Sequence, residues 1–453
     1  MIRNLVVSAL YILAVHYAYV SYISPTFEYA HYTYLPPDFI NLTTTYFLTW
    51  LVVFAHRDSA HPSQAAAVLI YTLCYVPIQL SLLFTVEREY LSILPAQMAL
   101  AFSMAMIFVF ARSGPIGKPG ASVEFKTLDL SLGLITVITI ISIVIFNRDH
   151  MRLVSFADVY ELRADSADVT SNQLFNYLTS WVSYCFISYF FARGIINKKK
   201  LHIGLGVMGS LVLYMATGAK ASLLLLPMTI CVVAIWKNGP GFLSRILFTL
   251  VTLIFILVFL LPDDGLFLWV KSIMLVRIIG SSGWVASKYF EYFETNGYTY
   301  YTHIGPVNSI FNSYPYGNYS LGQIIGVEYS GSVEANFNAS FWASDGFAAA
   351  GIFGILMVTL PLILLLYLIN YLTVSFQTRF VVAWNTGFFV AILNVPLSTA
   401  LLSGGGIIIL LLSWNKSRRQ MRRVSNKNQK QALICVTPKM FHMHNNQINT
   451  FQK

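Results

Sequence analysis

Five residues in the second half of the chain are spaced as one face of a helix. Arg277, Ser281, Trp284, Lys288 and Glu291 follow one another at intervals of four, three, four and three residues, with mostly apolar residues between them. Arginine and lysine bind and neutralise phosphate oxygens, so this face could hold an anionic group. The alternative is an interfacial helix whose charges meet only water and lipid headgroups.

Two isolated groups are further candidates for chemistry. Lys220 stands in a tight turn, residues 217–222, between two apolar runs. A cation at the edge of an apolar core is a functional candidate, although its long stem also allows it to reach the interface. His303 is the one histidine of its loop and could transfer a proton near neutral pH or serve as a hydrogen-bonded structural residue.

The segment 297–332 is rich in Gly, Asn, Ser and Tyr. Tyrosine pairs a flat apolar face with a hydroxyl, which suits sugar rings, but it is also common at membrane interfaces for its amphipathic character alone. The tyrosines of this segment include Tyr298, Tyr300, Tyr301, Tyr314, Tyr316 and Tyr319.

Several kinds of chemistry have no motif in the chain. There is no HExxH, no clustered Cys and His ligand set, no Walker loop, no GxSxG and no Rossmann glycine fingerprint. We therefore expect no cofactor and no metal. The remaining features, cations beside a Tyr-rich loop, favour an anionic and phosphate-bearing lipid substrate.

The composition defines the scaffold that must position these residues. Of the 453 residues, 56% are hydrophobic and 11% are charged, which leaves too little polar surface to cover a water-exposed globule. We therefore predict an all-α polytopic integral membrane protein. In a soluble protein, the net charge of +10 would suggest a nucleic-acid partner. In a membrane protein, the positions of Lys and Arg instead indicate which loops face the cytoplasm, so no nucleic-acid partner is expected.

Twelve apolar runs are long enough to be membrane spans, each requiring about 20 mostly apolar residues. They cover residues 5–23, 40–56, 64–86, 92–111, 130–146, 174–193, 201–217, 219–236, 243–261, 347–372, 378–393 and 396–413.

The charges orient these spans. With the N-terminus in the cytoplasm, 21 of the 29 Lys and Arg residues fall inside and 16 of the 19 Asp and Glu residues fall outside. Both termini are therefore predicted to be cytoplasmic. The basic tail, residues 414–453, could recruit a cytoplasmic partner or act as a stop-transfer anchor beside anionic headgroups.

The predicted map divides the chain into spans 1–9 (1–261), a large external loop (262–346), spans 10–12 (347–413) and the tail. A shorter external loop, residues 147–173, carries Arg163 among several acidic residues. Loops as long as the larger one are usually functional. Its first part, residues 266–295, has few helix breakers and is predicted to form the helix that carries the cationic face.

The stretch that leads out of the large loop resembles the Wzy-type oligosaccharide repeat-unit polymerases, or O-antigen polymerases, of bacterial surface polysaccharide assembly. These proteins share an Asn-rich stretch before a span of small residues. Here it reads Glu334-Ala-Asn336-Phe-Asn338-Ala-Ser-Phe-Trp-Ala-Ser-Asp345-Gly346-Phe-Ala-Ala-Ala-Gly351-Ile-Phe-Gly354. The Lys220 turn, Arg277, Asn394, Pro396 and Gly404 to Gly406 agree with the same pattern.

The resemblance implies a metal-independent, inverting glycosyltransferase of the bacterial inner membrane. Its donor would be a growing chain on undecaprenyl pyrophosphate, and its acceptor one repeat unit on a second such lipid. Arg163 and Arg277 would hold the diphosphates, with Lys220 adding positive charge. A chain-length regulator and a flippase of the same pathway would be partners.

Three residues could accept the proton of the attacking hydroxyl: His303, Glu334 or Asp345. Asp345 could instead cap a helix N-terminus. Asn336 and Asn338 could bind sugar hydroxyls or turn the chain. The competing interpretations are an O-antigen ligase, which uses the same donor, and a lipid-linked oligosaccharide flippase. A flippase would be expected to place its charges inside the bundle, often with internal repeats, and the sequence shows no repeat.

Overall fold

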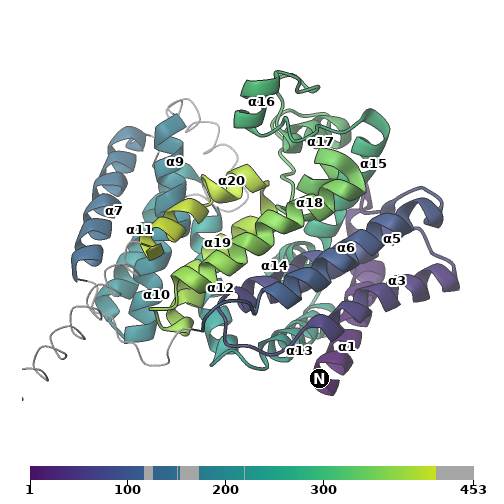
Figure 1. The fold of residues 1–453 in the computed structure, drawn as a ribbon, viewed down its shortest axis with the longest axis horizontal. Coiled ribbons are helices and arrows are strands. Elements are labelled where there is room, and N and C mark those ends of the chain that lie inside the picture. Colours follow the sequence, from purple (N-terminus) through teal and green to yellow (C-terminus); the bar gives the residue numbers. More distant parts are fainter. Residues whose placement is uncertain (117–125, 150, 154–172, 219, 415–453) are drawn as a thin grey trace, which may run out of the picture.

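The computed structural model describes residues 1–116, 126–149, 151–153, 173–218 and 220–414, and these residues contain helices and no strand (Figure 1). Predicted features that fall outside this range are Arg163, most of the loop 147–173 and nearly all of the basic tail.

The first half of the chain forms the helices up to α11. They are α1 (Ile2–Ala18), η1 (Tyr19–Ile23), α2 (Ser24–Phe27), η2 (Glu28–Ala30), α3 (Phe39–Leu51), η3 (Val52–Ala55), α4 (Ser63–Ile70), η4 (Tyr71–Tyr75), α5 (Val76–Thr85), α6 (Tyr90–Phe110), α7 (Lys126–Asn147), α9 (Gln173–Trp181), η5 (Val182–Ile187), α10 (Ser188–Asn197) and α11 (Lys200–Thr217).

The second half contains the large predicted loop and the last helices. They are α12 (Lys220–Trp236), α13 (Phe242–Phe255), η6 (Ile256–Leu260), α14 (Gly265–Leu275), η7 (Val276–Gly280), α15 (Ser281–Asn296), α16 (Gly305–Phe311), α17 (Leu321–Ser330), α18 (Ala343–Leu372), α19 (Thr378–Asn394) and α20 (Leu397–Leu401), followed by helical residues 406–414.

Nine helices within the described residues are long and apolar enough to cross a membrane. Eight of them correspond to predicted spans, and the ninth, Gly265–Asn296, lies in the segment predicted as the external loop. Four predicted spans are not among the nine. Two of these, 40–56 and 219–236, correspond to shorter apolar helices, Phe39–Ala55 and Ser222–Trp236. The protein is therefore a polytopic helical membrane protein, and twelve spans stay a prediction.

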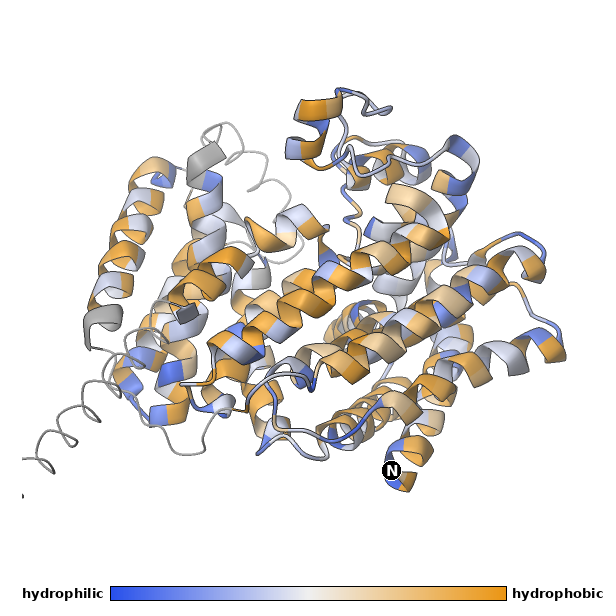
Figure 2. Cartoon of the chain, viewed as in Figure 1, coloured by the Kyte–Doolittle hydropathy of each residue, from blue (hydrophilic) through white to orange (hydrophobic). Residues whose placement is uncertain are grey.

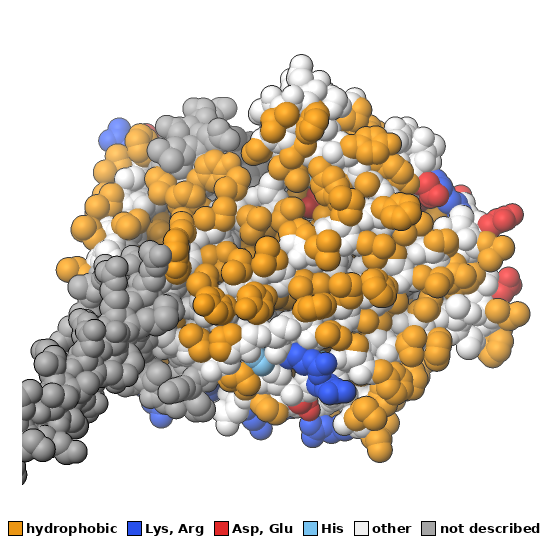
Figure 3. Space-filling model, viewed as in Figure 1, with side chains coloured by type: hydrophobic (Ala, Val, Ile, Leu, Met, Phe, Trp, Pro, Cys, Tyr) orange, Lys and Arg blue, Asp and Glu red, His pale blue; other side chains and the backbone are white. Residues whose placement is uncertain are grey.

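Apolar side chains cover the outside of the bundle. They follow the long helices in Figure 2 and form a broad band in Figure 3, where Lys and Arg gather mainly along the lower edge, near the N-terminus. Arg3 and Arg245 lie together, both beside Gly241. Under the positive-inside rule this edge is the predicted cytoplasmic side.

The predicted helix 266–295 is present as one continuous helix, α14–η7–α15, whose first half is largely exposed and whose second half is not. Its second half packs between α5 and α18. Near its start, the buried Lys271 bonds to Asp263 at 2.7 Å in the turn after η6. Near its end, Glu294 pairs with Arg88 in the turn after α5. Both turns belong to the predicted external side, and in that predicted topology this helix would not cross the membrane, although it is long and apolar enough to do so.

The helix α18 is sharply bent, which modifies the predicted span 347–372. Ala350 and Gly351 leave helical geometry, and Gly346 approaches the backbone of Gly354, eight residues further along the chain. The amides of Thr299 and Tyr300 donate to the carbonyls of Ala348 and Ala349 at 2.9 and 2.7 Å, which satisfies acceptors freed by the bend. The straight membrane helix therefore begins at residue 352.

Replacing Gly351 with Ala should destabilise the bend. Its φ of 61° and ψ of −139° lie in a region that is costly for any other residue, by about 1–3 kcal/mol. A Cβ atom there would also stand 2.7 Å from the Tyr298 hydroxyl oxygen. We expect a lower thermal unfolding midpoint for the detergent-purified variant. Gly204→Ala is the control, because nothing lies within 4 Å of its added Cβ. Equal midpoints for the two variants would contradict this account.

Candidate functional site

The predicted cationic face of helix 265–296 is covered by the segment 31–33 around Trp284. Tyr32 stacks on Trp284 with ring centroids 5.6 Å apart, and the Trp284 indole N–H donates to the carbonyl of His31 at 2.9 Å. Phe337 closes the other side of Trp284, with centroids 4.9 Å apart. The part of the stripe from Trp284 to Glu291 therefore packs against other segments, whereas Arg277 is exposed, as the interfacial alternative expects.

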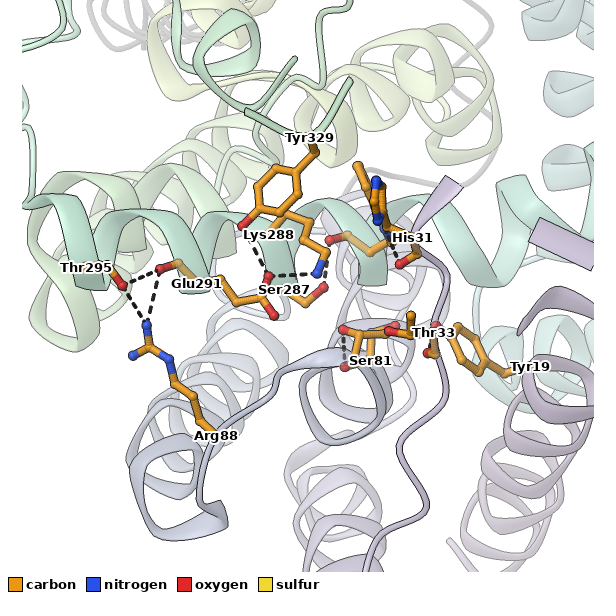
Figure 4. Close-up of polar contacts among 12 residues, drawn as sticks. Tyr19, His31, Thr33, Ser81, Arg88, Ser287, Lys288, Glu291, Thr295 and Tyr329 are labelled. Carbon is orange, nitrogen blue, oxygen red and sulfur yellow. Dashed lines mark hydrogen bonds and ion pairs between the residues drawn. The ribbon is translucent and has the colours of Figure 1, made fainter. Parts of the chain in front are cut away.

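Lys288 and Glu291 form a buried ion pair at the centre of this face (Figure 4). The Lys288 ammonium lies 2.7 Å from the Glu291 carboxylate, and their side chains are 8% and 18% exposed. The Tyr329 hydroxyl donates to the same carboxylate at 3.2 Å, and the ammonium lies 5.1 Å from the centre of its ring. Burial, and then the Glu291 charge, raise the pKa of Tyr329, so it stays a neutral donor.

Arg88 approaches the same helix from the turn between α5 and α6. Its guanidinium pairs with Glu294. It also donates to the Thr295 hydroxyl at 2.8 Å and to the Glu291 carbonyl at 3.3 Å (Figure 4). This arginine therefore caps the last turn of α15, where a cation also meets the negative end of the helix dipole favourably.

These groups surround an open polar pocket of about 390 Å³. The pocket is lined by His31, Thr33, Thr85, Glu87, Arg88, Lys288, Glu291 and Thr295. On its other side, Arg88 borders a narrow crevice of about 40 Å³ between α5, α6, α15 and α18, where most of the lining is apolar. The site thus offers hydrogen-bonding groups beside a smaller apolar recess.

Arg277 stands outside the pocket, about three turns earlier on the same helix. It is exposed, and within the part of the chain that the structure describes no hydrogen bond or ion pair holds its guanidinium. Burial raises the pKa of Tyr32 to about 12, while the nearby Arg277 charge acts in the opposite direction. The preceding helix, α14, exposes the apolar Phe267, Ile273 and Met274.

His303 and Asp345, both proposed as proton acceptors, are brought together in a second, buried cluster. The His303 Nε2 atom lies 2.9 Å from one Asp345 oxygen, and the other oxygen accepts the Leu397 amide at 2.7 Å. The Thr299 hydroxyl meets His303 Nδ1 at 2.7 Å. The side chains of His303 and Asp345 are only 4% and 1% exposed. The pair therefore ties the loop 297–304, the start of α18 and the start of α20 together.

The remaining predicted residues are not gathered at one place. Glu334 and Asn336 are exposed on the segment before α18. Lys220 begins α12, which packs mainly against α19 and α11. Arg163 lies outside the described residues. Of the predicted site residues within the described ranges, the structure thus pairs His303 with Asp345, and places Arg277 and Lys288 on one helix.

Sequence reasoning did not single out Arg88 or His31. Arg88 had a usable signal, because it is one of only eight Lys and Arg residues on the predicted external side and stands in a turn between two spans. His31 had none, since its position over α15 depends on the path of a segment some 250 residues away in sequence.

No group of three or more His, Cys, Asp or Glu side chains within the described ranges could hold a metal ion. Comparisons of the chain with protein-family models, with curated proteins and with solved structures give no match.

Asp345→Ala should loosen the buried cluster. It leaves the Leu397 amide and His303 without their acceptor, and each unsatisfied buried group costs about 1–3 kcal/mol. We expect a lower unfolding midpoint and faster hydrogen exchange in residues 297–304 and at Leu397. Glu334→Ala, which removes an exposed carboxylate eleven residues earlier, should change neither. Unchanged hydrogen exchange at Thr299 and Leu397 would contradict the proposed stabilising role of the His303–Asp345 cluster.

Proposed function

We propose that this protein polymerises oligosaccharide repeat units linked to undecaprenyl pyrophosphate, at the outer face of a bacterial inner membrane. The observation that carries the proposal is the division of one helix into three environments. The first half exposes apolar side chains at the bundle surface, Arg277 follows as an exposed cation, and the polar pocket follows about three turns later. A substrate with a lipid tail, a diphosphate and sugars has the same three parts in the same order.

In this proposal Arg277 binds the diphosphate of the donor. When the bond between the anomeric carbon and the pyrophosphate oxygen breaks, negative charge develops on the leaving lipid diphosphate. The Arg277 guanidinium can stabilise that charge through two parallel hydrogen bonds. The acceptor hydroxyl forms the new glycosidic bond from the opposite face and gives its proton to a carboxylate.

The structure changes which carboxylate we favour for that proton. His303 and Asp345 are buried and bonded to each other, so their proposed role becomes that of positioning the loop 297–304. Glu87 and Glu291 line the pocket, and Glu87 is exposed. We therefore propose one of these two as the acceptor, with Glu334 on the exposed segment nearby as the alternative from the sequence.

The test of the function is a gel of surface polysaccharide from a strain that lacks this protein. If flipping and ligation remain intact, single repeat units still reach the lipid A core. The expected pattern is core plus one repeat, without a ladder of longer chains.

The same gel separates the competing functions. Bare core with accumulated lipid-linked polymer would identify a ligase. Bare core without lipid-linked polymer would favour the flippase, because both enzymes would lack substrate. An unchanged ladder would refute all three functions in that strain.

Arg277→Ala should abolish long chains while the protein still inserts into the membrane, and Arg277→Lys should restore them only in part. Lysine keeps the charge but lacks the planar pair of donors. The measurement is the ladder in the deletion strain complemented at native expression. Arg148→Ala is the matched control, since Arg148 is another exposed arginine on the predicted external side, 75% exposed. A normal ladder from Arg277→Ala would remove this residue from the site.

A further inference from the structure

We infer that the polar pocket beside Lys288 is a subsite for an uncharged sugar residue, which discriminates against acidic sugars and does not hold the diphosphate. This inference rests on the proposed function, since it names the substrate class that the pocket would take. It is argued from the charges, the hydrogen-bonding groups and the size of the pocket.

The charges of the pocket argue against an anion. Its two cations are already held by carboxylates, Lys288 by Glu291 at 2.7 Å and Arg88 by Glu294. The wall itself contains two carboxylates, Glu291 and Glu87, while Glu294 lies outside the lining. A diphosphate would therefore have to displace existing ion pairs and approach the like charge of Glu87. Arg277, outside the pocket, has no such competitor among the described residues.

The hydrogen-bonding groups suit a sugar. Three threonines, Thr33, Thr85 and Thr295, face the pocket together with the carboxylate of Glu87. The Thr85 and Thr295 hydroxyls already donate to the carbonyls of Ser81 and Glu291, at 2.8 and 3.0 Å. These two hydroxyls and the carboxylates can therefore accept from sugar hydroxyls, and the Thr33 hydroxyl can also donate. The volume of about 390 Å³ falls within the ~300–1,000 Å³ usual for small-molecule sites. An acidic sugar would bring its own carboxylate against Glu87 and Glu291, which gives the pocket a repulsive element against that class.

Glu87 is the residue through which this discrimination can be tested. It is exposed, it lines the pocket, and no hydrogen bond or ion pair holds its carboxylate within the described part of the chain, so Glu87→Gln should fold normally. Glu89→Gln is a matched control, because Glu89 is an exposed carboxylate of the same turn that does not line the pocket.

The experiment is saturation-transfer NMR on the full chain purified in detergent, with N-acetylglucosamine, glucuronic acid and inorganic pyrophosphate as separate probes at millimolar concentrations. The wild type should bind N-acetylglucosamine at least tenfold more tightly than glucuronic acid. Glu87→Gln should reduce that ratio several-fold by strengthening glucuronic acid binding, and Glu89→Gln should leave it unchanged. Thr33→Phe, which fills the pocket, should weaken binding of N-acetylglucosamine.

Several results would overturn the inference. The wild type would bind glucuronic acid as tightly as N-acetylglucosamine, or would not bind N-acetylglucosamine at all. The ratio of the two affinities would be unchanged in Glu87→Gln. Pyrophosphate binding would be abolished by Thr33→Phe and not by Arg277→Ala. The outcome is separable from that of the polymerase. An intact ladder in the deletion strain would refute the polymerase, while pocket-dependent sugar binding would still stand.

Discussion

The burial of the Lys288 ammonium is the constraint on which the arrangement of the site depends. A buried cation needs an anion and further polar partners, and removing one member of such a pair costs about 3–5 kcal/mol. Glu291 lies one turn along the same helix, and Tyr329 supplies both a hydroxyl for the carboxylate and a ring for the ammonium. The pair therefore fixes the position of α17 over α15.

A second polar cluster fixes the bent helix α18 in the same manner. The loop 297–304 donates backbone N–H groups to carbonyls at the bend, and His303 joins it to Asp345. Gly351 permits the bend because it has no Cβ atom to meet Tyr298. Phe347, just before the bend, stacks on Phe290 of α15 with ring centroids 3.7 Å apart. The two clusters thus hold α15 and α18 against each other, and the apolar crevice beside Arg88 lies between them.

This arrangement suits a substrate whose parts differ in polarity. Apolar side chains of α14 are exposed at the bundle surface and Arg277 is exposed beside them. Further along the same helix, Lys288, Glu291 and Thr295 line the polar pocket. A rigid helix that carries all three environments keeps them at fixed separation, which is what positioning a reacting bond between a lipid diphosphate and a sugar requires. Placing the diphosphate and the sugar at different points of the helix also accounts for carboxylates in the pocket.

The sequence by itself determined the class of the protein and the helix that carries the site. Composition and the length of the apolar runs establish a helical membrane protein, because the bilayer requires long apolar segments. The spacing of Arg277, Ser281, Trp284, Lys288 and Glu291 established their common face, since helical periodicity is local. Only the tertiary structure decided what covers that face, because His31, Arg88 and Tyr329 reach it from distant segments. It also decided that His303 meets Asp345 and that α18 bends, since both depend on packing between segments that local sequence does not specify.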